Sequence, residues 1–341
     1  MPELRKDPIV GRWVIIATER ARRPGNIIDP SEIVREQTQL ACPFCEHQEK
    51  AVAPEIFAFR GNPQPNGPGW QVRVVPSQNP FLQYENYCQR RGHGLYDVMN
   101  AYGTHETVIE TPQHIENMAD LDLGQIELVV KSYALRCREL SRNPELKFIM
   151  AFKNYSRAIP LHFAHTRSQI VATPINPMRA KDKLKGARHY YQYHERCIYC
   201  DLIVQELDAK KRIVLETDHF VVITPFASRF PFETWIIPKK HACDFHKGIE
   251  GYEGDLARAL KSILQKVKIG LRDPEYNFVI HSAPIRKDNG RQWLTIEDDY
   301  HWHMEVMPVL TRVAGFEKGT GFYICVIPPE QTAEYLREVK V

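Results

Sequence analysis

The chain lacks a long hydrophobic run and a strong excess of charge. Its N-terminal segment, MPELRKDPIVGRWVIIATER, has an apolar run of only about five residues, too short for a secretory signal peptide. No segment approaches the ~20 apolar residues that span a bilayer. The net charge of +3 gives no field that favours nucleic acid, so any phosphate binding must come from local Arg and Lys side chains. We therefore expect a cytoplasmic protein with neither a membrane nor a nucleic-acid partner.

Cysteine is present, but its arrangement does not indicate a disulfide framework. Four of the eight cysteines form two Cys-x-x-Cys pairs with histidines downstream, which in a cytoplasmic chain is typical of metal binding. The remaining four are scattered and are interpreted as ordinary thiols (Cys88, Cys137, Cys243 and Cys325). With 341 residues, 43% of them hydrophobic and 26% charged, the chain is long enough for two soluble domains with separate cores.

The most informative feature is a motif that occurs twice. Each copy begins with a Cys-x-x-Cys pair, continues to a single histidine and ends in a His-x-His or His-x-Arg triplet. The first copy contains Cys42, Cys45, His114 and the triplet His165-Thr166-Arg167. The second contains Cys197, Cys200, His241 and the triplet His301-Trp302-His303. A repeated set of this kind predicts a duplicated domain.

Two cysteines and two histidines make a complete tetrahedral set of zinc ligands. The tight Cys-x-x-Cys turn brings two thiolates together, and two histidines from later strands complete the site. Because four protein ligands leave no open coordination position, we expect two structural Zn²⁺ ions rather than catalytic ones. The predicted ligands are Cys42, Cys45, His114 and His165 in the first site, and Cys197, Cys200, His241 and His301 in the second.

The pattern around each motif predicts an α+β fold of two tandem repeats, in which an antiparallel sheet carries a helix on one face. In the first repeat the expected elements are strands at 70–76 and 105–112, a helix at 118–142, and strands at 147–154 and 164–174. In the second they are strands at 219–225 and 232–241, a helix at 254–268, and strands at 276–282 and 301–308. The predicted domains are residues 1–177 and 197–341, joined by a helical connector at 178–196.

The third position of each triplet decides the chemistry. Residues i and i+2 of a strand face the same side, so the third side chain projects beside a metal-bound histidine. A histidine there can attack phosphorus and carry a nucleotidyl group. Arg167 cannot, because a guanidinium stays protonated and has only donors, so it can bind a phosphate without becoming a covalent carrier.

Several long segments, in order, resemble the galactose-1-phosphate uridylyltransferase branch of the histidine-triad superfamily. They cover almost the whole chain: RKDPIVGRWVIIATERARRP (5–24), CPFC (42–45), VRVVPSQNPF (72–81), GTHETVIETPQH (103–114), SQIVATP (168–174), PFETWIIPKKH (231–241), HWHMEVMP (301–308) and GFEKGTGFYICVIPPE (315–330). The resemblance implies two histidine-triad-like repeats and an enzyme of carbohydrate metabolism that transfers a nucleoside monophosphate. The implied partners are a nucleotide sugar or other nucleotide, and a sugar phosphate or phosphate as acceptor.

The resemblance also implies roles for individual residues. Phosphate contacts fall to Arg20, Arg23, Asn154 and Gln169, and a nucleoside contact to Asn79. Phe316 and Glu317 match a segment that holds sugar hydroxyls, often from the partner subunit of a homodimer. In parts of the family the residue matching His303 holds a second metal together with the residue matching His281.

The family's active centre is altered in this chain. A His-Pro-His-x-Gln stretch normally supplies the nucleophile as its second histidine, and the matching stretch here is His165-Thr166-Arg167-Ser168-Gln169. The family also has a glycine-rich run before this stretch, which lets backbone amides approach phosphates. The corresponding residues 155–164, YSRAIPLHFA, contain no glycine.

Three hypotheses remain open. In the first, covalent chemistry moves to the second repeat, with His303 as nucleophile and His281 as a possible orienting group, although His303 could instead be a metal ligand or a packed histidine. In the second, transfer is direct and Arg167 stabilises the transition state, as in relatives that use adenylyl donors such as adenylylsulfate or dinucleoside polyphosphates. In the third, the protein is a non-catalytic nucleotide-binding relative.

Overall fold

The computed structural model describes residues 2–22, 41–84, 88–159, 163–286 and 294–341. The first half of the chain contains β1 (Glu3–Lys6), β2 (Trp13–Ile16), η1 (Thr18–Arg22), η3 (Glu49–Ala51), β3 (Phe57–Arg60), β4 (Trp70–Pro76), β5 (Arg90–His93), β6 (Tyr96–Met99), β7 (Thr104–Ile109), η4 (Met118–Asp120), α1 (Leu123–Leu140), β8 (Phe148–Tyr155) and β9 (Arg167–Thr173). The second half contains α2 (Met178–His194), α3 (Ile198–Ala209), β10 (Ile213–Glu216), β11 (Phe220–Ile223), β12 (Thr234–Pro238), α4 (Phe245–Gly248), α5 (Glu253–Gly270), β13 (Tyr276–His281), α6 (Ile296–Asp299), β14 (His303–Pro308), α7 (Gly315–Thr320), β15 (Tyr323–Cys325) and α8 (Pro329–Glu338).

The two repeats are confirmed by the strand order of one ten-stranded sheet. The strand order is β10-β11-β12-β14-β13-β8-β9-β7-β4-β3. Counted outward from the central pair β13 and β8, each strand of one repeat has its counterpart at the same distance in the other repeat, for example β14 and β9. The helix α1 takes the same place between β7 and β8 as α5 takes between β12 and β13. The predicted α+β class is therefore correct, and the two half-sheets are continuous because β8 pairs antiparallel with β13.

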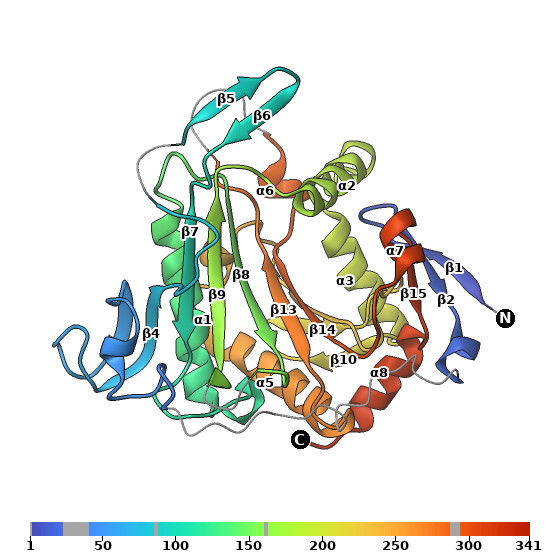
Figure 1. The fold of residues 1–341 in the computed structure, drawn as a ribbon. Coiled ribbons are helices and arrows are strands. Elements are labelled where there is room, and N and C mark those ends of the chain that lie inside the picture. The colour runs from blue at the N-terminus through green and yellow to red at the C-terminus, as the bar shows by residue number, and fades with distance from the viewer. Residues whose placement is uncertain (1, 23–40, 85–87, 160–162, 287–293) are drawn as a thin grey trace.

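One face of this sheet is covered by α1 and α5, which lie side by side (Figure 1). Apolar residues that recur at helical spacing are buried there, for example Ile126 and Tyr133 in α1 and Leu256 and Ile263 in α5. They pack against alternate strand residues of both repeats in one core. Burial of these side chains, at roughly 1.5–3 kcal/mol each, is the main force that holds the helices on the sheet.

The predicted helix at 118–142 is shorter than expected at its N-terminal end. A 3-10 turn occupies Met118–Asp120, and the α-helix begins at Leu123 because Asp122 caps it by accepting a hydrogen bond from the backbone N–H of Gln125 at 2.7 Å. The predicted connector is helical, as α2.

The opposite face of the sheet differs between the repeats. In the second repeat, α2 and α3 cover it, and a second core lies beneath them that includes Leu184, Ile198, Tyr199 and Trp235. In the first repeat, a smaller cluster around Phe44, Trp70 and Ile109 covers only part of that face. The segment β1-β2-β15 forms a separate three-stranded sheet, and the β5-β6 hairpin projects from the body (Figure 1).

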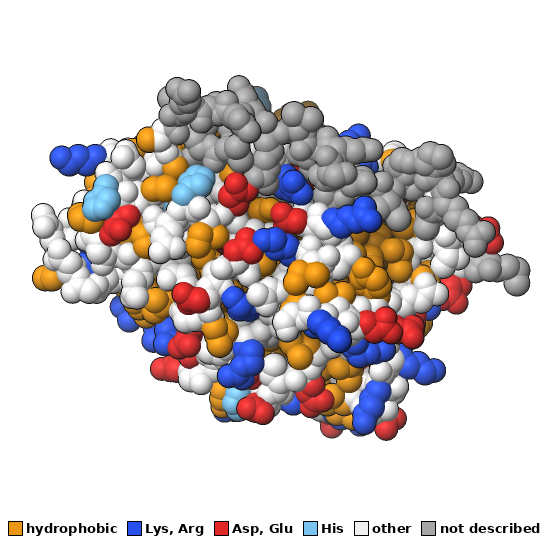
Figure 2. All heavy atoms as spheres, turned by 90° about the horizontal axis from the view of Figure 1, so that it is seen from below, with side chains coloured by type: hydrophobic (Ala, Val, Ile, Leu, Met, Phe, Trp, Pro, Cys, Tyr) orange, Lys and Arg blue, Asp and Glu red, His pale blue; other side chains and the backbone are white. Residues whose placement is uncertain are grey.

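On the one face that Figure 2 shows, the coloured part of the surface has mixed rather than segregated charge. The face drawn in Figure 2 carries Lys and Arg side chains interspersed with Asp and Glu. This distribution agrees with the small net charge of +3.

Candidate active site and metal centres

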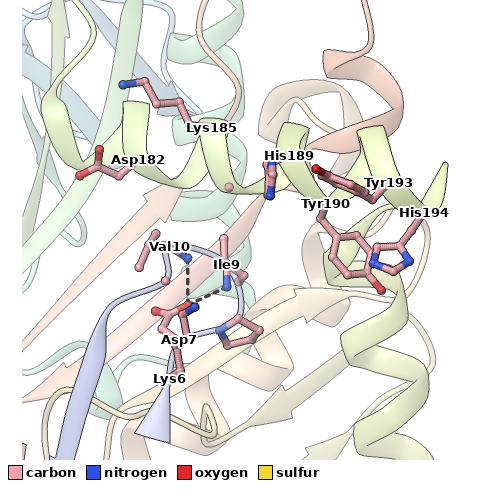
Figure 3. A pocket seen from close by; sticks show the side chains of 13 residues that line it. Lys6, Asp7, Ile9, Val10, Asp182, Lys185, His189, Tyr190, Tyr193 and His194 are labelled. Atoms are coloured by element: carbon pink, nitrogen blue, oxygen red, sulfur yellow. Dashed lines mark hydrogen bonds between the residues drawn. The ribbon is translucent and has the colours of Figure 1, made fainter.

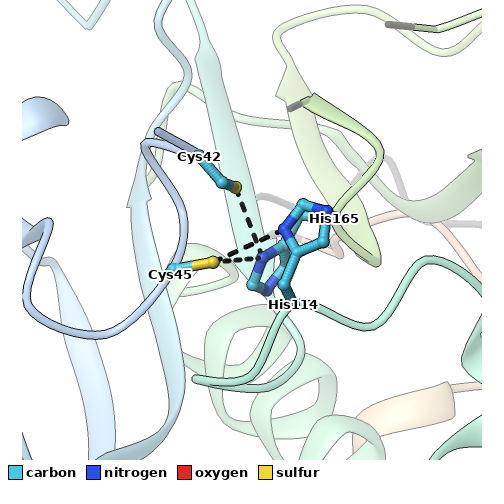
Figure 4. A group of neighbouring side chains, drawn as sticks. All are labelled: Cys42, Cys45, His114 and His165. Atoms are coloured by element: carbon cyan, nitrogen blue, oxygen red, sulfur yellow. Dashed lines mark hydrogen bonds between the residues drawn. The ribbon is translucent and has the colours of Figure 1, made fainter. Parts of the chain in front are cut away.

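The first Cys/His group comes together as predicted. Cys42 and Cys45 lie on the turn before η3, His114 follows β7, and His165 immediately precedes β9 (Figure 4). The Sγ atom of Cys42 lies 3.5 Å from Nδ1 of His165, and that of Cys45 lies 3.5 Å from Nδ1 of His114. The chain thus gathers four ligand atoms from segments as far apart as residues 42 and 165.

The second group repeats this arrangement. Its two cysteines stand at the start of α3, and its histidines follow β12 and precede β14. Sγ of Cys200 lies 3.3 Å from Nδ1 of His241 and 3.6 Å from Nδ1 of His301.

These distances fit a tetrahedral metal ion. Zn–S and Zn–N bonds of about 2.3 and 2.0 Å give a sulfur-to-nitrogen edge of about 3.5 Å in an ideal tetrahedron. The histidine tautomers also fit, because Nε2 of His165 donates to the carbonyl of Thr111 and Nε2 of His241 donates to the carbonyl of Glu297, each at 2.8 Å. Nδ1 of each ring therefore points its lone pair toward the cysteines. Both groups could hold a metal ion.

Both triplets lie at the start of a strand rather than inside it. Arg167 and His303 are the first residues of β9 and β14, and the preceding histidines lie just outside. Along β9, Ser168 and Ile170 face the helices, since Ser168 bonds Tyr133 of α1 and Ile170 belongs to the core. Arg167 and Gln169 therefore share the face that α2 and α3 leave open in the first repeat.

Arg167 lies on this open face and is half-buried. Its Nη1 donates to the carbonyls of Phe163 at 2.5 Å and His165 at 3.1 Å, and the guanidinium lies 4.9 Å from the ring centre of Phe44. Burial lowers the pKa of Arg167, yet the group remains a cation at neutral pH. Both of these hydrogen bonds use Nη1, so among the described residues Nη2 and Nε are available to an anion.

Little space surrounds the guanidinium. Among the described residues, the cavity that Arg167 lines with Asn154 has a volume of about 20 Å³, and Ile159 and Phe163 line it as well. Both of these bulky residues belong to the segment that lacks glycine. A cavity of this size holds about one water molecule, so it is too small for a phosphate group.

Gln169 is fixed by a residue that the sequence did not single out. Nε2 of His105 donates to Oε1 of Gln169 at 2.8 Å, and the ring of Phe81 packs against His105 with centroids 4.2 Å apart. Because its oxygen is occupied, Gln169 presents its amide N–H donors to the open face. Asn79 is exposed in the same loop as Phe81, two residues before it.

His303 and His281 occupy a different environment. His303 is 0% exposed, and its ring stacks between those of Trp235 and His281 beneath α2. Nε2 of His303 lies 2.7 Å from Nζ of Lys183. Burial, and next the charge of Lys183, lower the pKa of His303 well below its usual value. The ring is neutral, but its burial leaves no approach for a nucleotide, which disfavours the hypothesis that His303 is the nucleophile.

Three of the residues that the family resemblance assigned to substrate binding lie away from both Arg167 and His303. Arg20, Phe316 and Glu317 line one pocket of about 480 Å³ between η1, β15 and α7. In Figure 1 this region and β9 stand on opposite sides of β13 and β14. One chain therefore does not bring these residues to Arg167 and Gln169. Arg23 lies outside the described residues.

A larger pocket, of about 720 Å³, contains none of the predicted site residues that the structure describes. It lies between residues 6–11 and α2 (Figure 3). The backbone N–H groups of Ile9 and Val10 donate to the carboxylate of Asp7 there. Gly186 allows the loop to pack on the helix, since a Cβ atom at this position would lie 1.6 Å from the carbonyl oxygen of Ile9.

Comparison with known proteins decides the family. The sequence model described as galactose-1-phosphate uridyl transferase, N-terminal domain, matches residues 1–177, and the C-terminal domain model matches residues 183–336. The chain belongs to the galactose-1-phosphate uridylyltransferase family. It is a nucleotidyltransferase of that type, as the resemblance implied.

Two curated relatives match the chain over its full length. ADP-glucose phosphorylase of Arabidopsis thaliana is 34% identical, with 100% of this chain and 93% of the relative covered. Galactose-1-phosphate uridylyltransferase of Thermotoga maritima is 27% identical, with 100% and 99% covered.

Solved structures of similar proteins superpose on this chain over nearly its whole length. The crystal structure of the Arabidopsis ADP-glucose phosphorylase with bound ADP-glucose superposes with a TM-score of 0.81 at 32% identity, covering 100% of both chains. A uridylyltransferase structure superposes with a TM-score of 0.74 at 28% identity, covering 99% of this chain and 97% of the other. Among the described residues, no helix is long and apolar enough to cross a membrane.

A buried polar network on the helix side of the sheet holds the backbone of this family member's altered motif. Nζ of Lys153 donates to the carboxylate of Glu110 at 2.7 Å, to Oγ1 of Thr166 at 2.8 Å and to the carbonyl of Arg167 at 2.9 Å. Burial lowers the pKa of Lys153, and the charge of Glu110 opposes that shift. Sequence spacing gave no signal for this lysine, because it forms part of an ordinary alternating strand.

We expect Lys153→Met to lower the free energy of unfolding by about 3–5 kcal/mol, because it leaves Glu110 as an unpaired buried charge. Urea denaturation followed by circular dichroism measures this loss. The matched control is the double variant Lys153→Met/Glu110→Gln, which removes both charges and should recover a large part of it. Equal losses in the single and double variants would show that charge pairing is not the cause.

Proposed function

We propose that the protein transfers a nucleoside monophosphate from a nucleotide sugar directly to phosphate or a sugar phosphate, without a covalent histidyl intermediate. Two full-length relatives support a nucleotide-sugar donor, and the relative at 34% identity bears the name ADP-glucose phosphorylase. An adenylyl donor with phosphate as acceptor is therefore the favoured pair.

The observation that carries this proposal is the side chain at position 167. It is a guanidinium on the open face beside Gln169, where a covalent mechanism needs a neutral imidazole. The imidazole at the matching position of the second repeat, His303, is fully buried. A mechanism that needs no protein nucleophile is consistent with both facts.

In the proposed reaction, an oxygen of the acceptor phosphate attacks the phosphorus atom attached to the nucleoside. The bond from that phosphorus to the bridging oxygen breaks, and the sugar 1-phosphate leaves with the bonding electron pair. Arg167 and the amide of Gln169 donate hydrogen bonds to the non-bridging oxygens, where negative charge must be stabilised. His105 acts as a positioning residue because it keeps the Gln169 donors turned outward.

Direct transfer predicts inversion of configuration at phosphorus, because it is a single displacement. A double displacement through a histidine would give retention. The test uses ADP-glucose with a chiral α-phosphorothioate, with phosphate as acceptor, followed by ³¹P NMR of the product. Radiolabelled donor should leave no label on the protein. Retention, or label on a histidine, would show that the mechanism is covalent.

Variants at position 167 complete this test. Arg167→Ala should lower kcat/KM by about 10²–10³-fold, the usual loss for one donor to a developing charge, and Arg167→Lys should recover part of it. Arg167→His tests whether the imidazole alone restores uridylyl exchange and protein labelling. Each variant is assayed with UDP-sugars, ADP-sugars, adenylylsulfate and dinucleoside polyphosphates, with and without phosphate. No turnover by the wild type with any donor would contradict the proposal in favour of a nucleotide-binding role.

We further propose that both Cys/His groups hold structural Zn²⁺. Two thiolates and two imidazoles are a ligand set that zinc prefers. The distances between Sγ and Nδ1 atoms are those expected around a tetrahedral zinc ion. All four positions are taken by protein, so the ions would stabilise the fold. When bound, the first ion would fix His165 immediately before β9 and hence the start of the reactive strand.

The zinc proposal predicts two ions per chain by mass spectrometry of the purified protein. Cys42→Ser and Cys197→Ser should each lose about one ion and unfold at lower temperature, because metal binding contributes to folding free energy. As a matched control, Cys88→Ser removes a thiol outside both groups and should keep two ions. A Cys42→Ser protein that retains both ions would refute the first site.

A homodimer is part of the proposed function. Arg20, Phe316 and Glu317 line a pocket away from Arg167, although the family resemblance places all of them around one substrate. In a symmetric dimer, this pocket of one chain can complete the open face of the other. We place this dimer in the cytoplasm, where the eight cysteines of each chain, none of them in a disulfide among the described residues, are compatible with a reducing environment.

Mixing two inactive variants tests the shared site. Arg167→Ala damages the open face, and Glu317→Ala damages the pocket of the other region. If sites form across the dimer, heterodimers regain one intact site, and random reassociation of equal amounts should restore about a quarter of wild-type activity. Sites formed within one chain would give no restoration, and sedimentation velocity reports whether mixed dimers form.

A further inference from the structure

A third group of potential metal ligands lies under α2. It consists of His281 on β13 and His303 and Glu305 on β14, whose ligand atoms all lie within 4.8 Å of one another. In the first repeat, the same face of the sheet carries Arg167 and Gln169 instead. Since two imidazoles and a carboxylate are ligands that divalent ions commonly take in proteins, the group raises the question of whether this chain can bind one there.

The position that an ion would need is filled by Lys183 of α2. Its Nζ lies 2.7 Å from Nε2 of His303 and 2.5 Å from Oε1 of Glu305. These are two of the three groups that would have to bind the metal. Lys183 is 7% exposed, so the ammonium is held in the interior rather than passing over the surface.

The tautomer of His303 suits an ammonium partner. Its Nδ1 donates to the backbone carbonyl of His301 at 3.0 Å, so Nε2 carries the lone pair and accepts a hydrogen bond from the Lys183 ammonium. The ammonium also lies 5.1 Å from the ring centre of Trp235, a favourable distance for a cation–π contact. Lys183 thus satisfies lone pairs of two of the three groups that a metal ion would bind, His303 and Glu305.

The surrounding charges are already balanced. Nη2 of Arg229 donates to Oε2 of Glu305 at 2.6 Å and to Oε1 of Glu233 at 2.7 Å. Two buried cations therefore face two buried carboxylates. An added divalent ion would bring two further positive charges into a buried site, which is strongly unfavourable.

We propose that Lys183 is an internal cation that replaces a metal ion in the cluster of His281, His303 and Glu305. The cluster is closed to metals in this chain, and the ammonium fastens the connector helix α2 to the second repeat. The face of the second repeat that corresponds to the Arg167 face of the first is therefore occupied by the Lys183 side chain, whose charge belongs to the protein itself. Removing that charge should turn the cluster into a metal site.

The test counts Mn²⁺ ions, because Mn²⁺ suits carboxylate and imidazole ligands and competes poorly for thiolate sites. Full-length wild type, Lys183→Glu and Lys183→Met are incubated with excess Mn²⁺, desalted and measured by mass spectrometry. We expect no retained Mn²⁺ in the wild type and about one per chain in Lys183→Glu, which supplies a fourth ligand. Lys183→Met offers only three ligands and should bind Mn²⁺ more weakly.

A second variant and a stability measurement make the result specific. Lys183→Glu/His281→Ala should lose the added ion, because it removes one of the proposed ligands. Mn²⁺ should raise the melting temperature of Lys183→Glu but not that of the wild type, since an ion that binds only the folded state stabilises it. Retained Mn²⁺ in the wild type at this cluster would overturn the proposal, as would a folded Lys183→Glu protein that keeps its other metals and binds none.

Discussion

The hydrogen bonds between β8 and β13 join the two repeats into one sheet, and the placement of every candidate site depends on that pairing. Tyr276 pairs with Tyr155 and Ile280 with Ala151, so the central strands of the two copies are in register. The helices α1 and α5 then cover one common face with one core. The two Cys/His groups lie at corresponding places on either side of this central strand pair, and so do the first residues of β9 and β14.

The symmetry ends at the other face of the sheet. The connector helix α2 and the helix α3 cover it only in the second repeat, where Lys183 binds His303 and Glu305. Arg167 stands at the matching position of the first repeat, on a face that α2 and α3 do not cover. A duplicated fold therefore has two unequal faces, of which that of the second repeat is used for internal packing against α2 and α3.

The arginine at position 167 changes the charge of the site as well as its shape. An imidazole can lose and gain a proton or a nucleotidyl group, whereas a guanidinium keeps its charge and can only donate. The carbonyls of Phe163 and His165 hold part of that guanidinium, and Ile159 and Phe163 line the cavity of about 20 Å³ beside it. The result is a fixed positive charge at a position where a histidine could be neutral.

Much of the fold was predictable because its signals are local or periodic. The apolar positions of α1 and α5 follow helical spacing. The two Cys-x-x-Cys pairs with their histidines predict the duplication and both ligand sets. The roles of Lys183, Lys153 and His105 were not predictable, since each acts through partners up to 122 residues away and carries no spacing signal of its own. The sequence by itself determined the repeats, the ligand types and the guanidinium at position 167, because these depend on residue identity and order. Only the tertiary structure decided which repeat keeps an open face and which cluster is filled by an ammonium, because those outcomes depend on where α2 packs.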